Sequence, residues 1–136
     1  MHLKTTITEI RESFQDSPFI SHIGLDIVHF EEGDVLLKLP VEEKLLNVNK
    51  TMHGGVHATV LDTVLGMTIR SITGTRCLTV SLNIHYLSPS DSGVVYAEGK
   101  VIKQGYRTVI AEGEMFDSDG TVLAKAIGTF KLVRDK

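Results

Sequence analysis

The chain lacks the cysteines and long apolar runs that mark many secreted and membrane proteins. Cys77 is the single cysteine among 136 residues, so no internal disulfide bond can form. No stretch has the roughly 20 consecutive apolar residues that a membrane-spanning helix needs. The first residues are polar and have no apolar segment like that of a signal peptide. We therefore expect a cytoplasmic protein without a membrane partner.

An excess of positive charge is also absent. The chain has 14 Lys and Arg against 17 Asp and Glu, a net charge of −3, which disfavours nucleic acid as the main partner. Its 42% hydrophobic and 23% charged residues are ordinary for a globular protein. The length suits one domain, so we expect residues 1–136 to form a single domain with its own core.

Hydrophobic periodicity predicts one short helix, two strands, one long helix and four more strands, in that order. The short helix is expected to end at Ser17-Pro18, and the turn Asp117 to Gly120 predicts a hairpin between the last two strands. The expected helices are 4–16 and 53–72, and the expected strands are 25–30, 35–39, 78–86, 94–102, 108–116 and 122–132.

The long helix is apolar around most of its circumference, which is typical of a buried helix. The strand that follows alternates strictly, and the alternation places Leu78, Val80, Leu82, Ile84 and Tyr86 on one face. One antiparallel β-sheet wrapped around one long central helix, an α+β architecture, is the arrangement that these elements favour. Such a sheet leaves a strand edge and a helix face exposed, so we expect self-association.

Asp62 is a charged residue in the middle of the helix that should be buried. An ionised carboxylate there is costly unless it is paired or borders a solvent-filled cleft. One interpretation is that Asp62 caps a neighbouring backbone group or faces a polar seam. The other is that it acts as a base or nucleophile in a dry site, where its reactivity can be tuned.

The segment His53-Gly54-Gly55 lies where the long helix is expected to begin. Glycines let the backbone approach a ligand closely, and the first N–H groups of a helix are unpaired and carry the positive end of its dipole. These are the components of an oxyanion hole, in which N–H donors stabilise the negative oxygen formed during acyl transfer. The same glycines could equally make only a tight turn into the helix.

Helix geometry restricts how Gly54 and Asp62 could act together. Eight positions correspond to about 12 Å of helix rise, so one helix cannot present both groups to the same carbonyl. Two copies of the helix packed antiparallel about a two-fold axis can do so. If both groups act on one substrate, the active site therefore lies between two subunits.

Two other kinds of site are disfavoured. His53 and His57 have the i, i+4 spacing of metal ligands, but His85 is the one further candidate and no cluster of cysteines or carboxylates completes a site. We therefore expect no metal. The Gly-x-Ser-x-Gly pattern around a nucleophilic serine is absent as well, which disfavours a Ser-His-Asp triad.

The sequence resembles the hotdog-fold thioesterases from about residue 20 to the C-terminus. The resemblance is strongest for the branch named after the phenylacetate-degradation protein PaaI, which includes thioesterase superfamily member 2. The segments that carry it are Asn47, His53-Gly54-Gly55, Ala58-Thr59, Asp62-Thr63, Gly66, Thr79 to Pro89 and Lys103-Gln104-Gly105. It implies the hotdog fold and a dimer of dimers, a homotetramer, with active sites at the subunit interface.

The resemblance implies roles for individual residues. Asp62 falls on the catalytic carboxylate, which acts as a nucleophile or as a general base toward water. Gly54 falls on the glycine whose N–H polarises the thioester carbonyl, with Gly55 beside it. His53 falls on the histidine that shapes the oxyanion region.

Two further residues would assist in the same way. Asn47 falls where relatives position the water or the thioester, and Thr79 falls on a Ser or Thr that assists water placement near the acid. Asn47, His53 and Gly54 would come from one subunit, and Asp62 and Thr79 from the other.

Contacts with CoA are implied less specifically. Lys103 and Arg107 would meet CoA phosphates, although such side chains are often merely solvated surface charges. The residues that resemble a CoA channel are Tyr86, Ser88, Pro89, Lys103, Gly105 and Arg107.

The activity that the resemblance implies is hydrolysis of an aryl- or medium-chain acyl-CoA to the free acid and CoA, without a cofactor. Asp62 is an aspartate, as in the PaaI-like branch, so the arylacyl-CoA branch that uses glutamate is a poorer guide to the substrate. A dehydratase or hydratase of the same fold is an alternative, but it needs a paired histidine and acid for proton transfer at the acyl chain. A module that binds acyl-CoA without catalysis is a second alternative.

Overall fold

The computed structural model describes residues 7–134, and the expected elements form within one or two residues of their predicted ranges where these fall inside the described part. Residues 4–6 of the expected first helix lie outside it. The helices are α1 (Ile7–Gln15), α2 (Pro18–Ile23), the 3-10 turn η1 (Glu43–Leu45) and α3 (Gly54–Thr73). The strands are β1 (Asp26–Glu31), β2 (Asp34–Pro40), β3 (Cys77–Tyr86), β4 (Val94–Gln104), β5 (Thr108–Asp117) and β6 (Val122–Leu132).

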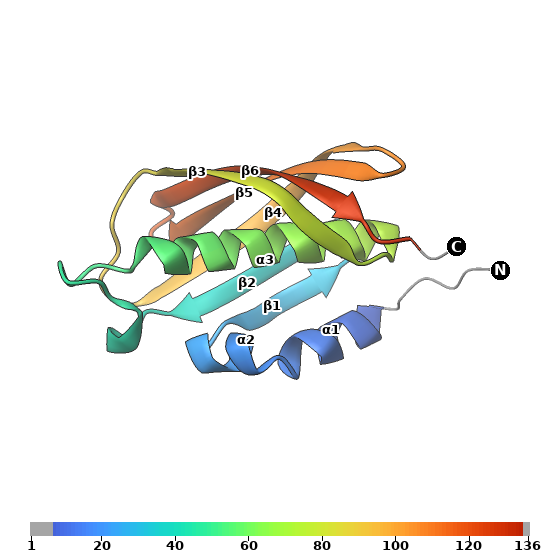
Figure 1. Ribbon diagram of the computed structural model, residues 1–136. Helices are drawn as coiled ribbons and strands as arrows, with labels where there is room; N and C mark the ends of the chain where they lie inside the picture. The colour runs from blue at the N-terminus through green and yellow to red at the C-terminus, as the bar shows by residue number, and fades with distance from the viewer. Residues whose placement is uncertain (1–6, 135–136) are drawn as a thin grey trace.

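The described strands form one antiparallel sheet in the order β1-β2-β4-β5-β6-β3. The pairs β1–β2, β4–β5 and β5–β6 are consecutive in sequence, whereas β2 pairs with β4 across the intervening α3 and β3, and β3 pairs with β6 at the edge of the sheet. The long helix α3 lies along one face of this sheet (Figure 1). The predicted α+β architecture is therefore confirmed.

Two glycines allow α3 to lie close to the middle of the sheet. Gly99 of β4 and Gly113 of β5 are directly paired, and both face α3. A Cβ atom at Gly113 would lie 2.9 Å from Leu65 Cδ2 and 2.8 Å from the Glu98 carbonyl oxygen. Leu65 itself is fully buried, so the absent side chains of these glycines leave the space that it fills.

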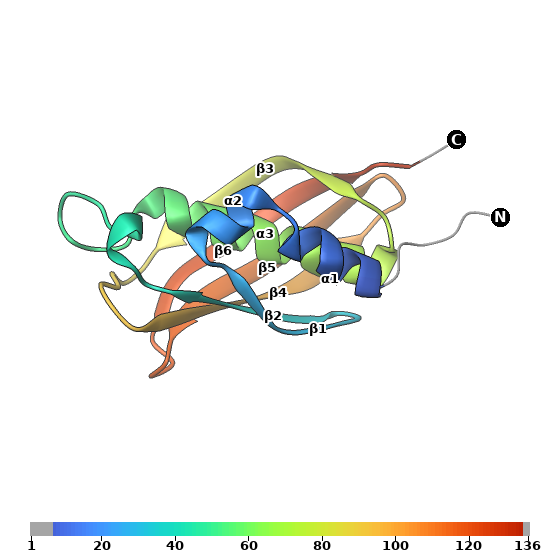
Figure 2. The same cartoon turned by 90° about the horizontal axis from the view of Figure 1, so that it is seen from below.

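The N-terminal segment contains a second helix that the sequence analysis did not predict. Ser17-Pro18 ends α1, as expected, but the same residues begin α2, because Ser17 caps it and Pro18 occupies its first turn. Helix α1 packs against α3 and β1 (Figure 2), and its buried residues are Ile10 and Phe14. A cap followed by proline was therefore a start signal as well as a stop signal.

Strand β3 is an edge strand whose inward face differs from the prediction. A β-bulge between Thr79 and Ser81 leaves Val80 as an extra residue opposite β6. Leu78 and Val80 are 61% and 62% exposed, whereas Leu82 packs against the core. The expected single apolar face from Leu78 to Tyr86 is wrong, because the bulge shifts the alternation by one residue.

No helix in residues 7–134 is both long and apolar enough to span a membrane. The interior is instead built by α3 and the inward side chains of the strands, with α1 and α2 completing it along one side. The alternation expected for β6 is confirmed from Ala124 to Leu132, with buried residues at every second position.

We expect Gly113→Ala to lower the free energy of unfolding by about 1–3 kcal/mol, because the added methyl group must displace backbone or Leu65. Gly66→Ala is the matched control. A Cβ at Gly66 meets only Cys77 Sγ, at 3.9 Å, and alanine favours a helix interior. Urea denaturation of both variants is the measurement, and equal stability of Gly113→Ala and the unaltered chain would contradict the close-approach argument.

Candidate active site

The side chain of Asp62 lies beside strand β3. The hydroxyl of Thr79 donates a hydrogen bond of 2.6 Å to Asp62 Oδ1. Thr79 points toward α3 immediately before the β3 bulge, which sets its direction. One carboxylate oxygen of Asp62 is thus held in place, while Oδ2 has no hydrogen bond from residues 7–134.

A hollow of about 320 Å³ includes both Asp62 and Thr79. Helices α1 and α3 form two of its sides, and the start of β3 forms a third. Its lining residues are Ile10, Ser13, Phe14, Asp62, Thr63, Gly66, Met67, Arg70, Arg76, Cys77, Thr79 and Phe130. Asp62 is half-buried and Thr79 is exposed, so the carboxylate borders solvent in a partly apolar hollow and does not lie in the dry site expected from the sequence.

The charge of Asp62 affects a neighbouring thiol. Burial raises the pKa of Cys77 to about 11, the negative charge of Asp62 adds to the rise, and the positive charge of Arg70 opposes it. The Cys77 thiol also donates a long hydrogen bond to the carbonyl of Gly66 on α3. Cys77 is therefore a protonated packing residue beside Asp62, not a nucleophile.

Helix α3 begins at Gly54, and its first two backbone N–H groups differ in whether they have a hydrogen-bond partner. His53 is the N-cap, and its Nδ1 accepts a hydrogen bond of 2.8 Å from the Gly55 N–H. Accepting at Nδ1 places the proton of the neutral ring on Nε2. The Gly54 N–H has no partner within residues 7–134, so it is the donor left available at the positive end of the helix.

Asn47 stabilises the loop that leads into α3. Its Oδ1 accepts hydrogen bonds from the backbone N–H groups of Asn49 and Thr51, and its Nδ2 donates to Thr51 Oγ1. The loop contains Lys50 at φ 64, a conformation that these bonds support. Within one protomer Asn47 thus orders the backbone before His53, and any role toward water or substrate stays a prediction.

Tyr86 connects the end of β3 to the start of α3. Its hydroxyl donates a 2.9 Å hydrogen bond to the Gly54 carbonyl, and its ring meets His57 edge to face at 5.4 Å. His57 is buried, and its Nε2 has no hydrogen-bond partner in the described structure. No group of three His, Cys, Asp or Glu in residues 7–134 could hold a metal ion.

The residues expected to contact CoA form two separate sets within one protomer. Tyr86, Ser88 and Pro89 lie where β3 ends, beside the start of α3. Lys103, Gly105 and Arg107 lie at the β4–β5 hairpin, near the opposite end of the sheet (Figure 1). The strand register separates the two ends by roughly 25–30 Å, so the described chain does not bring them together.

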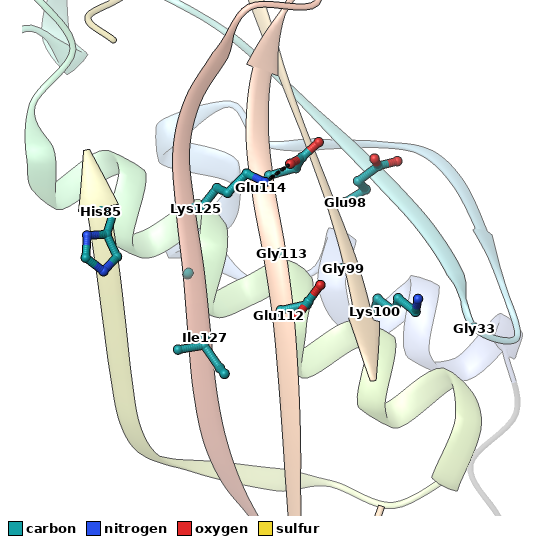
Figure 3. A pocket seen from close by; sticks show the side chains of 11 residues that line it. Gly33, His85, Glu98, Gly99, Lys100, Glu112, Gly113, Glu114, Lys125 and Ile127 are labelled. Carbon is teal, nitrogen blue, oxygen red and sulfur yellow. Dashed lines mark ion pairs between the residues drawn. The ribbon is translucent and has the colours of Figure 1, made fainter. Parts of the chain in front are cut away.

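A larger hollow, about 670 Å³, lies on the other face of the sheet (Figure 3). Glu98, Glu112 and Glu114 alternate along their strands with residues that face α3, so their side chains point away from it. Lys125 pairs with Glu114 at 3.3 Å. Mixed charges on an exposed sheet face are typical of a solvated surface, and none of the residues predicted for the site lines this hollow.

Sequence reasoning missed the contribution of α1 and of two arginines to the hollow around Asp62. Ile10 and Phe14 reach it because α1 docks on α3, a long-range contact that periodicity does not reveal. The position of Arg70 could have been predicted from the sequence. Asp62, Gly66 and Arg70 are spaced at i, i+4 and i+8, which places them on the same side of the helix.

We expect the free energy of unfolding to fall as the pH drops below about 6.5, partly through His57. Burial lowers the pKa of His57 below 6.5, and its hydrogen bond to the His53 carbonyl only partly offsets this. The unfolded chain therefore takes up a proton at a higher pH than the folded chain does. The stabilisation is complete above the unfolded pKa and is lost as the pH falls through the folded value.

The measurement is urea denaturation across this pH range. His57→Gln should show a shallower pH dependence than the unaltered chain, because its side chain does not titrate. His22→Gln, at an exposed position on α2, is the control and should keep the full dependence. An identical pH dependence in all three proteins would show that His57 is not responsible.

Comparison with known proteins shows which family the chain resembles in sequence and fold. The sequence profile of the family described as the Thioesterase superfamily matches residues 49–124, more than half of the chain. This range begins before His53 and includes Asp62 and Thr79. Human acyl-coenzyme A thioesterase 13 is 32% identical over 83 residues, which cover 60% of this chain and 59% of that protein.

Two solved structures share the fold. Thioesterase superfamily member 2 of zebrafish is 26% identical with a TM-score of 0.84, over 94% of this chain and 99% of that one. The PaaI protein of the Escherichia coli phenylacetic acid degradation operon is 20% identical with a TM-score of 0.85, over 96% and 99%. With its six-stranded sheet around α3, the described chain has the hotdog fold and belongs to the thioesterase superfamily.

Proposed function

We propose that the protein is a cytoplasmic acyl-CoA thioesterase that hydrolyses an aryl- or medium-chain acyl-CoA to the free acid and CoA. The observation that carries this proposal is the Asp62 carboxylate, held by the Thr79 hydroxyl at 2.6 Å within a partly apolar hollow. A carboxylate with one oxygen fixed and one free is suited to activating water or to attacking a carbonyl carbon. Membership of the thioesterase superfamily supports the choice of a thioester as the substrate.

The proposed chemistry uses Asp62 in one of two ways. As a general base, it takes a proton from water while the water oxygen attacks the thioester carbonyl carbon. As a nucleophile, it forms an acyl-enzyme anhydride that water then hydrolyses. In both routes the C–S bond breaks, and the CoA thiolate leaves and is protonated.

The Gly54 N–H is the proposed donor to the carbonyl oxygen, which becomes negative in the tetrahedral intermediate. This proposal is supported by the hydrogen bonds at the start of α3. The neighbouring Gly55 N–H donates to His53 Nδ1, whereas the Gly54 N–H has no partner in residues 7–134. A donor at a helix N-terminus adds the favourable field of the helix dipole. Asn47 and the Nε2–H of His53 would order the loop and the edge of this oxyanion site.

We also propose that the functional unit is a homo-oligomer, a dimer at least and a tetramer as a dimer of dimers. Gly54 and Asp62 are separated by about 12 Å of helix rise, so they meet one carbonyl only if they belong to different subunits. Strand β3 supports this proposal, because it is an edge strand with Leu78 and Val80 exposed. A two-fold arrangement would also place one end of each sheet near the opposite end of its partner, which suits the divided CoA contacts.

Asp62→Asn is expected to lower kcat for acyl-CoA hydrolysis by at least about a hundredfold while acyl-CoA binding is largely retained. The amide keeps the shape and the hydrogen bond from Thr79 but loses the basic, nucleophilic oxygen. The loss of kcat is measured as the rate of CoA release from a panel of aryl and aliphatic acyl-CoA thioesters. Asp119→Asn, in the exposed turn before β6, is the matched control. Near-full hydrolysis by Asp62→Asn would overturn the mechanism.

A subunit-mixing experiment tests the shared site. Gly54→Pro deletes one N–H at a helix position where proline is tolerated, and the extended conformation of His53 suits a following proline. Each single variant should be inactive. Unfolding and reassembling them together should restore about a quarter of the normal activity, because half of randomly formed dimers contain one intact site.

No recovery, from mixtures shown to contain mixed dimers, would place both groups in the same subunit. Mixing Asp62→Asn with itself under the same conditions is the control for recovery that is unrelated to subunit exchange.

A further inference from the structure

Two arginines line the hollow around Asp62 and have no role in the proposed chemistry. Arg70 lies near the end of α3, and Arg76 lies just before β3. Neither belongs to an ion pair among residues 7–134. Arg70 Nε is shielded from solvent and has no hydrogen-bond partner there. An N–H donor of a charged guanidinium group that is shielded from water and has no hydrogen-bond partner raises the free energy of the folded protein. We therefore expect an acceptor atom of a ligand beside Arg70 Nε.

These arginines are not simply counter-ions of Asp62. The Asp62 carboxylate hydrogen-bonds Thr79, and no contact of ion-pair length joins it to Arg70 or Arg76. Between Asp62 and Arg70 the helix rises by about 12 Å. Cys77 lies between the two charges and responds to both, since Asp62 raises the pKa of its thiol and Arg70 lowers it. The hollow therefore has a negative part and a positive part.

The hollow is otherwise lined mostly by apolar side chains. Phe14 of α1, Met67 of α3 and Phe130 of β6 line it. Its volume of about 320 Å³ is at the lower end of the range for small-molecule pockets, roughly 300–1,000 Å³. This space suits an acyl group and is too small for a whole CoA molecule.

We infer that the protein prefers acyl groups that carry a carboxylate at the end remote from the thioester, and that Arg70 and Arg76 bind this carboxylate. The inference rests on the proposed thioesterase function. The planar guanidinium group of arginine can donate two parallel hydrogen bonds to a carboxylate. Asp62 repels the same carboxylate, so the two parts of the hollow together orient the substrate with its thioester at Asp62.

The phosphates of CoA offer the same anionic oxygen chemistry. In CoA the pantetheine arm separates them from the thioester, which favours a group on the acyl chain as the ligand inside this small hollow. Thioesters of N-acetylcysteamine lack all the phosphates but keep the thioester and the end of the arm. They distinguish the two sources of negative charge.

The experiment measures kcat and KM for adipoyl and hexanoyl groups, each as a CoA thioester and as an N-acetylcysteamine thioester. The unaltered protein should prefer adipoyl on both carriers. Arg70→Gln should lower kcat/KM for adipoyl about tenfold to a hundredfold, mainly through KM, and leave hexanoyl unchanged. Arg76→Gln should act in the same direction, and Arg70→Lys should retain part of the preference.

Arg11→Gln is the matched control, because Arg11 lies on α1 but does not line the hollow. It should leave the adipoyl preference intact. Urea denaturation of each variant identifies any loss that comes from unfolding, and the comparison of the two acyl groups on one folded variant is independent of the amount of active protein.

Three outcomes overturn the inference. Equal hydrolysis of adipoyl and hexanoyl thioesters by the unaltered protein would remove the preference itself. Equal losses on both acyl groups with both carriers would give Arg70 a structural role. Losses confined to the CoA thioesters would assign the arginines to phosphates. Each of these leaves the thioesterase proposal in place, which fails instead if no thioester is hydrolysed.

Discussion

The close contact between α3 and the middle of the sheet sets the position of every group in the candidate site. Gly99 and Gly113 leave space for Leu65, so the helix lies directly against β4 and β5. The same helix carries Gly54 at its start and Asp62 in its middle. Because one packed helix holds both groups, their separation is fixed by its regular rise and not by flexible loops. Chemistry that needs both groups at one carbonyl must therefore draw on a second copy of the helix.

Most of the fold could be predicted because each element has a clear local pattern. The apolar circumference of residues 53–72 indicated a buried helix, and the alternation in β6 indicated its inward face. The bulge at Val80 could not be predicted, because the residues around it continue to alternate and the extra residue exists only relative to β6. Helix α2 was missed for a different reason, since Ser17-Pro18 both ends one helix and begins the next.

The candidate site likewise has residues that the sequence could predict and residues that it could not. Asp62 could be identified in the sequence because an ionised carboxylate in an apolar helix is costly unless it has a partner or a function. Its partner Thr79 is 17 positions away and came only from the family resemblance, yet the structure joins the two by a short hydrogen bond. The spacing of Asp62 and Arg70 along α3 could indicate that they share a face, but the hollow itself depends on the docking of α1, which no local pattern encodes. Sequence thus identified the candidate carboxylate better than the cavity that surrounds it.

The bulge in β3 also determines where this strand can change its length in evolution. Thr79 and Leu82 both face inward because one additional residue lies between the two halves of the strand. Deleting Val80 would leave Thr79 and Leu82 two positions apart, so both would still face inward and the pairing with β6 would become regular. Deleting a residue after the bulge, such as Asn83, would instead turn every later side chain of the strand to the opposite face. Across related sequences, the gain or loss of one residue in β3 should therefore concentrate at Val80, whose side chain is exposed and contributes little to the core.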